Sequence, residues 1–247
     1  MNLGLKGKTA VVLAASKGMG RASAAALAEE GCRVAICART KADVERTGRE
    51  IGAEIAEAVD VEKRADMRGF LDGVLAKFGA IHVLVTNCGG PPPGRPLELD
   101  DTAWARAVES TLMVAINWVR AVAPTMIAQK WGRIVNITSI AVKQPVDTLI
   151  LSNTMRAGVV GFAKSMAKEL APHGITVNNL CPGLILTDRL KHLGDEHLRR
   201  MTAEIPMGRV GTPEEFAAVV AFLAGEPARY VTGATIQVDG GLYRGLL

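Results

Sequence analysis

The chain has 247 residues, of which 49% are hydrophobic and 22% are charged. These values are close to the average for a soluble globular domain, and they exclude a disordered chain, a collagen-like repeat and a coiled coil. The net charge of +4 is mildly basic, but Lys and Arg are spread along the chain without a run of five or more. Because a nucleic-acid surface needs a basic stripe, we expect no nucleic-acid partner.

Seven apolar runs predict β-strands, in chain order at 9–14, 33–37, 54–58, 82–86, 133–137, 176–181 and 235–238. Apolar residues at helical spacing predict helices at 18–30, 41–51, 62–78, about 101–128, about 148–171 and 213–224. This alternation predicts an α/β fold, a single Rossmann-type domain over 1–247 with a doubly wound parallel sheet of about seven strands. The polar segment at about 184–208 breaks the alternation, and we expect it to form a small lid over a site.

The four cysteines, Cys32, Cys37, Cys88 and Cys181, form no C-x-x-C pair and no cluster with the histidines. We therefore expect reduced, mostly buried thiols and no metal site. The start of the chain lacks the apolar stretch of a secretory signal, and no uninterrupted apolar run reaches transmembrane length. The expected location is the cytoplasm, without a membrane partner.

The turn after the first strand has the composition of a phosphate-binding loop. Gly18 and Gly20 open a helix directly after a strand, where glycines let the backbone approach a pyrophosphate. The alternative is a simple tight turn. The second strand is followed by Arg39, not by the acidic residue that usually holds the ribose of NAD. Lys17 and Arg39 are suited to a 2′-phosphate unless both are merely solvated surface cations, so we predict NADP(H) in preference to NAD(H).

Several further motifs occur in order along nearly the whole chain. They are Ser16-Lys17-Gly18-Met19-Gly20, Asp60-Val61, Asn87-Cys88-Gly89-Gly90, Asn136-Ile137-Thr138-Ser139, Pro182-Gly183-Leu184-Ile185-Leu186-Thr187, and Tyr230-Val231-Thr232-Gly233 followed by Asp239-Gly240-Gly241. On these motifs the sequence resembles the short-chain dehydrogenase/reductase family, in particular its members similar to 3-oxoacyl-acyl-carrier-protein reductase.

The resemblance implies a role for each matching position. The implied cofactor-binding residues are Ser16, Lys17, Gly18, Met19, Gly20, Arg39, Asp60, Val61, Asn87, Gly89, Arg156, Pro182, Gly183, Ile185 and Thr187. Ser139 would hydrogen-bond a substrate carbonyl. The resemblance also implies a homotetramer and a small-molecule substrate, either a carbonyl compound or an acyl thioester.

The sequence departs from the family at the catalytic positions. The family has a Tyr-x-x-x-Lys pair that begins 13 residues after the serine, and here those positions hold Ser152 and Arg156. The asparagine expected in the long helix is Thr111, and the first glycine of the turn is Ala14. The chain has two tyrosines, Tyr230 and Tyr243, and both lie far from the catalytic position.

These replacements remove the usual proton donor. A serine hydroxyl is far less acidic than a phenol, and arginine does not titrate in a proton relay. Arg156 can still hydrogen-bond the nicotinamide ribose, and Thr111 can hold a water molecule. Replacement acids would come from the rim of the site, and the candidates are His192, His197, Asp147, Lys143 and Arg95. Water is a further candidate for protonating an alkoxide held by Ser139 and Ser152.

Three hypotheses for function follow. The first is an NADP(H)-dependent oxidoreductase that acts on a ketone or 3-oxoacyl thioester with non-standard proton delivery. The second is redox-neutral chemistry on the same scaffold, as in a lyase or isomerase. The third is a nucleotide-binding pseudoenzyme that acts through its assembly.

Overall fold

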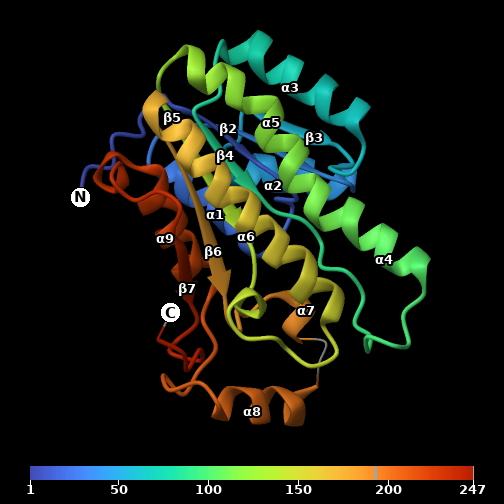
Figure 1. The fold of residues 1–247 in the computed structure, drawn as a ribbon. Coiled ribbons are helices and arrows are strands. Elements are labelled where there is room, and N and C mark those ends of the chain that lie inside the picture. Colours follow the sequence, from blue (N-terminus) through green and yellow to red (C-terminus); the bar gives the residue numbers. More distant parts are fainter. Residues whose placement is uncertain (192–193, 247) are drawn as a thin grey trace.

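The computed structural model describes residues 1–191 and 194–246, and its centre is a seven-stranded parallel sheet (Figure 1). The strands are β1 (Thr9–Val12), β2 (Arg33–Ala38), β3 (Ile55–Ala58), β4 (Val83–Thr86), β5 (Gly132–Ile137), β6 (Ile175–Pro182) and β7 (Thr235–Val238). Their order across the sheet is β3-β2-β1-β4-β5-β6-β7. The strand order reverses between β1 and β4, which is the defining feature of a doubly wound sheet. The predicted fold class is confirmed.

Helices cover both faces of the sheet (Figure 1). The α-helices are α1 (Gly18–Glu29), α2 (Lys41–Ile51), α3 (Arg64–Phe78), α4 (Asp101–Ala107), α5 (Val114–Ala128), α6 (Ile150–Leu170), α7 (Asp188–Lys191), α8 (Asp195–Ala203) and α9 (Pro213–Ala224). One hydrophobic core joins the sheet to α1, α2 and α9, and a second joins the opposite face to α3, α5 and α6. Because both faces are covered, the central strands β1, β2 and β4 are almost wholly apolar.

A row of hydrogen-bonded polar side chains crosses the sheet, from the last residue of β4 to the first residue of β7. Thr86 donates to Oδ1 of Asn136 at 2.7 Å, and Nδ2 of Asn136 donates to Oδ1 of Asn179 at 3.0 Å. Nδ2 of Asn179 donates in turn to the hydroxyl of Thr235 at 3.2 Å. Buried polar groups are tolerated when each has a partner, so these contacts fix the lateral alignment of β4 to β7 below the site.

Two predicted boundaries are corrected by residues in the left-handed backbone region. The first strand ends at Val12, before Ala14, because Ala14 has φ +47°. The long helix after β5 begins at Ile150, because Thr148 has φ +61° and does not continue a helix. Side chains with a Cβ rarely adopt this region, and a β-branched residue there is an outlier that the fold has to enforce.

The segment predicted as one helix at 101–128 contains an irregularity. A π-helical turn at Val108–Met113 lies between α4 and α5 and includes Thr111. Such turns insert an extra residue and often occur at functional sites. By length and composition alone the run Asp101–Ala128 is sufficient to cross a membrane, but Trp118 and Val122 lie in the core beneath the sheet.

Candidate functional site

The loop between β1 and α1 passes close to the neighbouring backbone and has no room for side chains at its glycines. Gly18 has φ +58°. A Cβ at Gly20 would lie 2.7 Å from the carbonyl oxygen of Ala14 and 2.8 Å from Nδ2 of Asn87. Asn87, at the end of β4, also donates to that carbonyl at 3.2 Å. The glycines therefore keep the start of α1 pressed against the ends of β1 and β4, with the helix N-terminus directed at the site.

A groove of about 420 Å³ lies over the carboxyl ends of β1, β2 and β4. Seven residues predicted to bind a cofactor line it: Ser16, Lys17, Arg39, Asp60, Val61, Asn87 and Gly89. Its walls also include residues that the sequence did not single out, among them Asp43, Arg106 and Ser110. A groove at the point where strand order reverses is where nucleotides bind in this class of sheet.

Two cations at one side of the groove are available for a ligand. Lys17 and Arg39 are exposed, and neither makes a side-chain hydrogen bond or ion pair with any residue that the structure describes. The acidic residue Asp60 turns its carboxylate to the backbone N–H of Glu62 at 3.2 Å. A dianionic phosphate fits beside the two free cations, so the groove fits NADP(H) by shape and charge.

A second, smaller cavity of about 10 Å³ adjoins the groove and has room for about one water molecule. Thr111 and Arg156 line it, and the Thr111 hydroxyl is buried beside the Cys88 thiol. Cys88 lines both this cavity and the groove. Burial raises the pKa of the Cys88 thiol, while the nearby charge of Arg156 acts in the opposite direction. Cys88 therefore stays a thiol at neutral pH and serves as a wall between the two spaces.

The predicted catalytic residues lie at the ends of β5 and α6. Arg156 is 9% exposed, and its Nη1 donates to the carbonyl oxygens of Ile137 at 2.9 Å and Thr138 at 3.1 Å. Ser152 lies one turn earlier on α6 and is buried. Oγ of Ser139 accepts from the backbone N–H of Ala141 at 3.1 Å, which leaves the serine proton available for an incoming oxygen. No hydrogen bond joins Ser139, Ser152 and Arg156 to one another in the part of the chain that the structure describes.

The residues predicted for the nicotinamide side follow β6. Pro182 is the last residue of β6, and Gly183 donates its N–H to Val238 at 3.0 Å. The side chain of Thr187 lies beside Gly18, because a Cβ there would be 3.3 Å from its Cγ2. Ile185 is buried in the core, against which Met19 also packs. The fold thus brings the loop after β6 to the glycine turn.

The candidate proton donors are scattered along the rim. Arg95 and Asp147 are exposed, and Lys143 is half-buried near Cys181. His192 lies outside the described residues, and His197 is in α8, where its side chain also lies outside the description. None of the three described candidates makes a hydrogen bond to Ser139 or Ser152.

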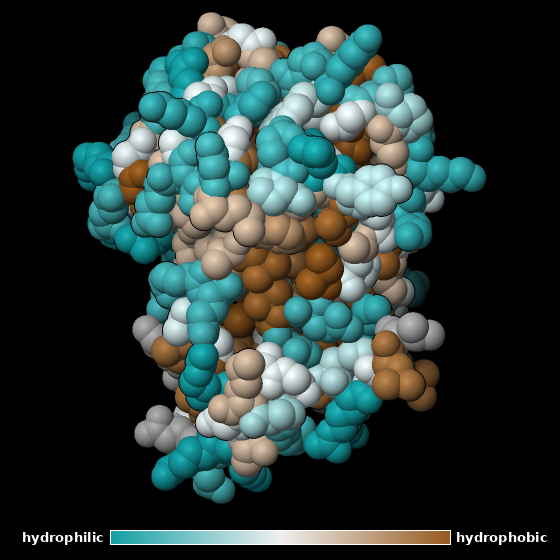
Figure 2. Space-filling view, turned by 90° about the vertical axis from the view of Figure 1, so that its left-hand side faces the viewer, coloured by the Kyte–Doolittle hydropathy of each residue, from teal (hydrophilic) through white to brown (hydrophobic). Residues whose placement is uncertain are grey.

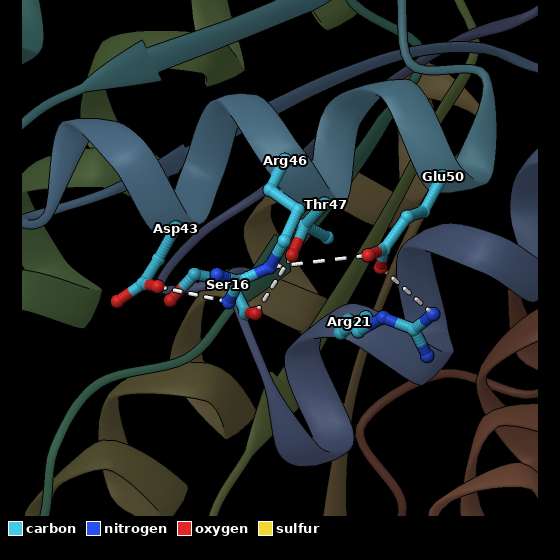
Figure 3. Close-up of polar contacts among 6 residues, drawn as sticks. All are labelled: Ser16, Arg21, Asp43, Arg46, Thr47 and Glu50. Carbon is cyan, nitrogen blue, oxygen red and sulfur yellow. Dashed lines mark hydrogen bonds and ion pairs between the residues drawn. The ribbon is translucent and has the colours of Figure 1, made fainter.

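One positioning residue was not found from the sequence. Thr47 in α2 is 1% exposed, and its hydroxyl donates to the backbone carbonyl of Ser16 at 2.8 Å (Figure 3). This bond attaches α2 to the phosphate-binding turn. No local pattern marks Thr47, because its partner lies 31 residues away in the sequence.

Comparisons with known proteins place this geometry in a family. Residues 13–243 match the family model described as enoyl-(acyl carrier protein) reductase. The 3-oxoacyl-[acyl-carrier-protein] reductase FabG of Vibrio cholerae is 35% identical, over 98% of this chain and 99% of that protein. The FabG of Staphylococcus epidermidis is 37% identical, over 96% of this chain and 99% of that protein.

Solved structures agree. The L-sorbose reductase of Gluconobacter frateurii, complexed with NADPH and L-sorbose, superposes with a TM-score of 0.95 at 31% identity and covers all of both chains. YwfH, an NADPH-dependent reductase involved in bacilysin biosynthesis, superposes with a TM-score of 0.93 at 30% identity, over 97% of this chain and 99% of that chain. This chain belongs to the short-chain dehydrogenase/reductase family. It is an oxidoreductase of that family, and the lyase, isomerase and pseudoenzyme hypotheses are not favoured.

Proposed function

We propose that the protein is an NADP(H)-dependent oxidoreductase that interconverts a carbonyl and a hydroxyl group on a small molecule, such as a ketone or a 3-oxoacyl thioester. The observation that carries the cofactor preference is the pair of free cations, Lys17 and Arg39, in a groove that has no acidic residue directly after β2. The FabG relatives are reductases of 3-oxoacyl-acyl-carrier protein, the sorbose reductase was complexed with NADPH and L-sorbose, and YwfH is an NADPH-dependent reductase.

The proposed binding mode assigns each part of the groove a task. The N-terminus of α1 and its glycines would hold the pyrophosphate, and Asp60 and Val61 would contact adenine. Asn87 and Gly89 support the ribose side. The loop from Pro182 to Thr187 holds the carboxamide, and residues 184–208 form a lid within a single domain over 1–247. When bound, NADPH supplies a hydride to the substrate carbon.

The proposed chemistry differs from that of the family at the proton donor. We place Ser152 and Arg156 at the positions of the family's Tyr and Lys, and Thr111 at that of its Asn. Ser139 donates a hydrogen bond to the substrate carbonyl, and Arg156 holds the ribose diol, while neither supplies a titratable proton. The proton then comes from water or from a side chain on the rim. Loss of a positioned acid typically costs about 10²–10⁴-fold in rate, so we expect slow turnover.

Binding and turnover of the purified protein test this function. Fluorescence titration should show tighter binding of NADPH than of NADH. Arg39→Ser should lower the affinity for NADPH about tenfold and leave the affinity for NADH unchanged. With a panel of ketones and 3-oxoacyl thioesters, NADPH consumption should equal alcohol formation. No consumption across the panel despite NADPH binding would overturn the proposed reaction. Cleavage or isomerisation of a substrate without net cofactor change would support the redox-neutral alternative.

A homotetramer in the cytoplasm is part of the proposal. β7 is an edge strand whose four residues are all half-buried, and Phe222 of the neighbouring α9 is 38% exposed. Hydrophobic side chains gather in the middle of the face that carries these two elements (Figure 2). An open edge strand beside an apolar patch is suited to pairing with a second copy. Light scattering of the purified protein tests the assembly. The four cysteines are free, which suits a reducing compartment.

A further inference from the structure

The side of α2 that faces the phosphate-binding turn carries a ladder of ion pairs (Figure 3). Nη2 of Arg46 lies 2.8 Å from Oδ1 of Asp43, and its Nε lies 3.9 Å from Oε1 of Glu50. Glu50 continues the ladder to α1, where Nη2 of Arg21 lies 3.2 Å from its Oε2. Arg46 is thus held between two carboxylates, on the same side of the helix as the contact between Thr47 and Ser16.

Stability does not explain why Arg46 pairs with Asp43. The two side chains are 58% and 43% exposed, and exposed pairs at this spacing contribute little to the stability of a fold. The position of Asp43 is more informative. Its side chain lines the groove together with Lys17 and Arg39, the two cations that we assign to the 2′-phosphate.

An unpaired carboxylate at this place would act against the proposed cofactor preference. A carboxylate near the adenosine ribose accepts hydrogen bonds from the hydroxyls of NAD(H), and it repels the phosphate of NADP(H). Arg46 offsets this charge and directs Oδ1 of Asp43 along the helix. With Arg46 in place, the wall formed by Lys17, Arg39 and Asp43 stays favourable to an anion.

We propose that Arg46 is a specificity-determining positioning residue, which makes the groove selective for NADP(H) over NAD(H) by neutralising and orienting Asp43. This inference rests on the proposed function, because it concerns the same groove. It assigns Arg46 an indirect role, distinct from the direct phosphate contact proposed for Lys17 and Arg39.

The test is a double-mutant cycle read by equilibrium binding of NADPH and NADH. Arg46→Gln should lower the affinity for NADPH about 3–10-fold at low ionic strength and by less at high salt. Its affinity for NADH should stay within about twofold of that of the unmodified protein or increase. Asp43→Asn alone should bind NADPH with an affinity that is within about twofold of that of the unmodified protein, or higher. Asp43→Asn with Arg46→Gln should restore the affinity for NADPH to within about twofold of that of the unmodified protein, since residue 43 then carries no charge that needs neutralising.

Arg49→Gln is the matched control, because Arg49 is exposed on the same helix and has no ion pair among the described residues. It should change neither affinity. The proposal is overturned if the double variant loses as much NADPH affinity as Arg46→Gln, which would mean direct contact with the phosphate. It is also overturned if Arg46→Gln weakens NADPH and NADH equally. Failure of the unmodified protein to bind NADPH would instead contradict the proposed function.

Discussion

In the proposed site, the half that holds the cofactor and the half that holds the catalytic residues differ in how closely their residues match those that the resemblance implies. The cofactor half, over β1, β2 and β4, has Gly18 and Gly20 in its turn, two free cations and the contact of Asn87 with Ala14. The catalytic half, over β5 and α6, keeps Ser139 but has Ser152 and Arg156 where the resemblance implies Tyr and Lys. Shape and charge for binding a dinucleotide are thus separable from the group that delivers a proton. Four variants, taken in order of expected effect, test this division.

The largest effect should come from restoring the family's proton donor. Ser152→Tyr combined with Arg156→Lys should raise the turnover number with a carbonyl substrate by about 10²–10⁴-fold, because a phenol beside a lysine can donate the proton that a serine cannot. NADPH affinity should change little. Thermal unfolding of the variant controls for disruption by the larger side chain. An unchanged rate in a folded, NADPH-binding variant would show that the catalytic half lacks more than an acid.

A side chain at Gly20 should lower both the stability of the protein and its affinity for NADPH, because the backbone of the turn lies too close to leave room for it. Gly20→Ala places a Cβ 2.7 Å from the carbonyl oxygen of Ala14, and such overpacking typically costs about 1–3 kcal/mol. Unfolding midpoints and NADPH titration measure the loss. Gly69→Ala is the matched control, because no atom lies within 4 Å of its added Cβ in α3. It should stabilise the protein by up to about 1 kcal/mol through helix propensity. Equal effects at both glycines would contradict the packing argument.

A smaller gain is expected where the cofactor half departs from its family. Ala14 has φ +47°, a conformation that costs an L-residue about 1–2 kcal/mol. Ala14→Gly removes this strain but adds entropy to the unfolded chain, about 0.4–1 kcal/mol. The balance predicts a stabilisation of about 0.5–1 kcal/mol in denaturant unfolding, with NADPH affinity unchanged or higher. A destabilised variant would mean that the turn is not strained at this residue.

The amino end of the sheet, opposite both halves, gives the smallest effect. Nδ1 of His82 accepts from the backbone N–H of Thr9 at 3.0 Å. Burial, followed by the charge of Lys8, holds the pKa of His82 below its usual value of 6.5. The unfolded chain therefore takes up a proton first as the pH falls, and stability should decrease below about pH 6.5.

His82→Asn keeps an acceptor for Thr9 and removes the titration. Chemical denaturation between pH 5 and 7 should show a flatter pH profile for this variant. The His82→Asn variant and the unmodified protein should bind NADPH with the same affinity, because His82 lies away from the groove. Identical profiles would remove His82 from the pH dependence.

The sequence by itself determined the strand and helix order, the glycine turn and seven of the residues that line the groove. These are local features: apolar runs, helical spacing, and side chains that follow the ends of strands. The parallel sheet then gathers Ser16, Arg39, Asp60 and Asn87 at one edge, since each lies within four residues after the end of a strand. This part of the prediction needed only the alternation of elements.

Only the tertiary structure decided the remainder. The contact of Thr47 with Ser16, the place of Asp43 in the groove and the buried hydroxyl of Thr111 all depend on how separate helices pack. The strained φ of Ala14 and Thr148, which ends one element early and starts another late, is likewise imposed by surrounding contacts. Local propensity favours the opposite outcome at both residues, so packing energy summed over the fold had to override it.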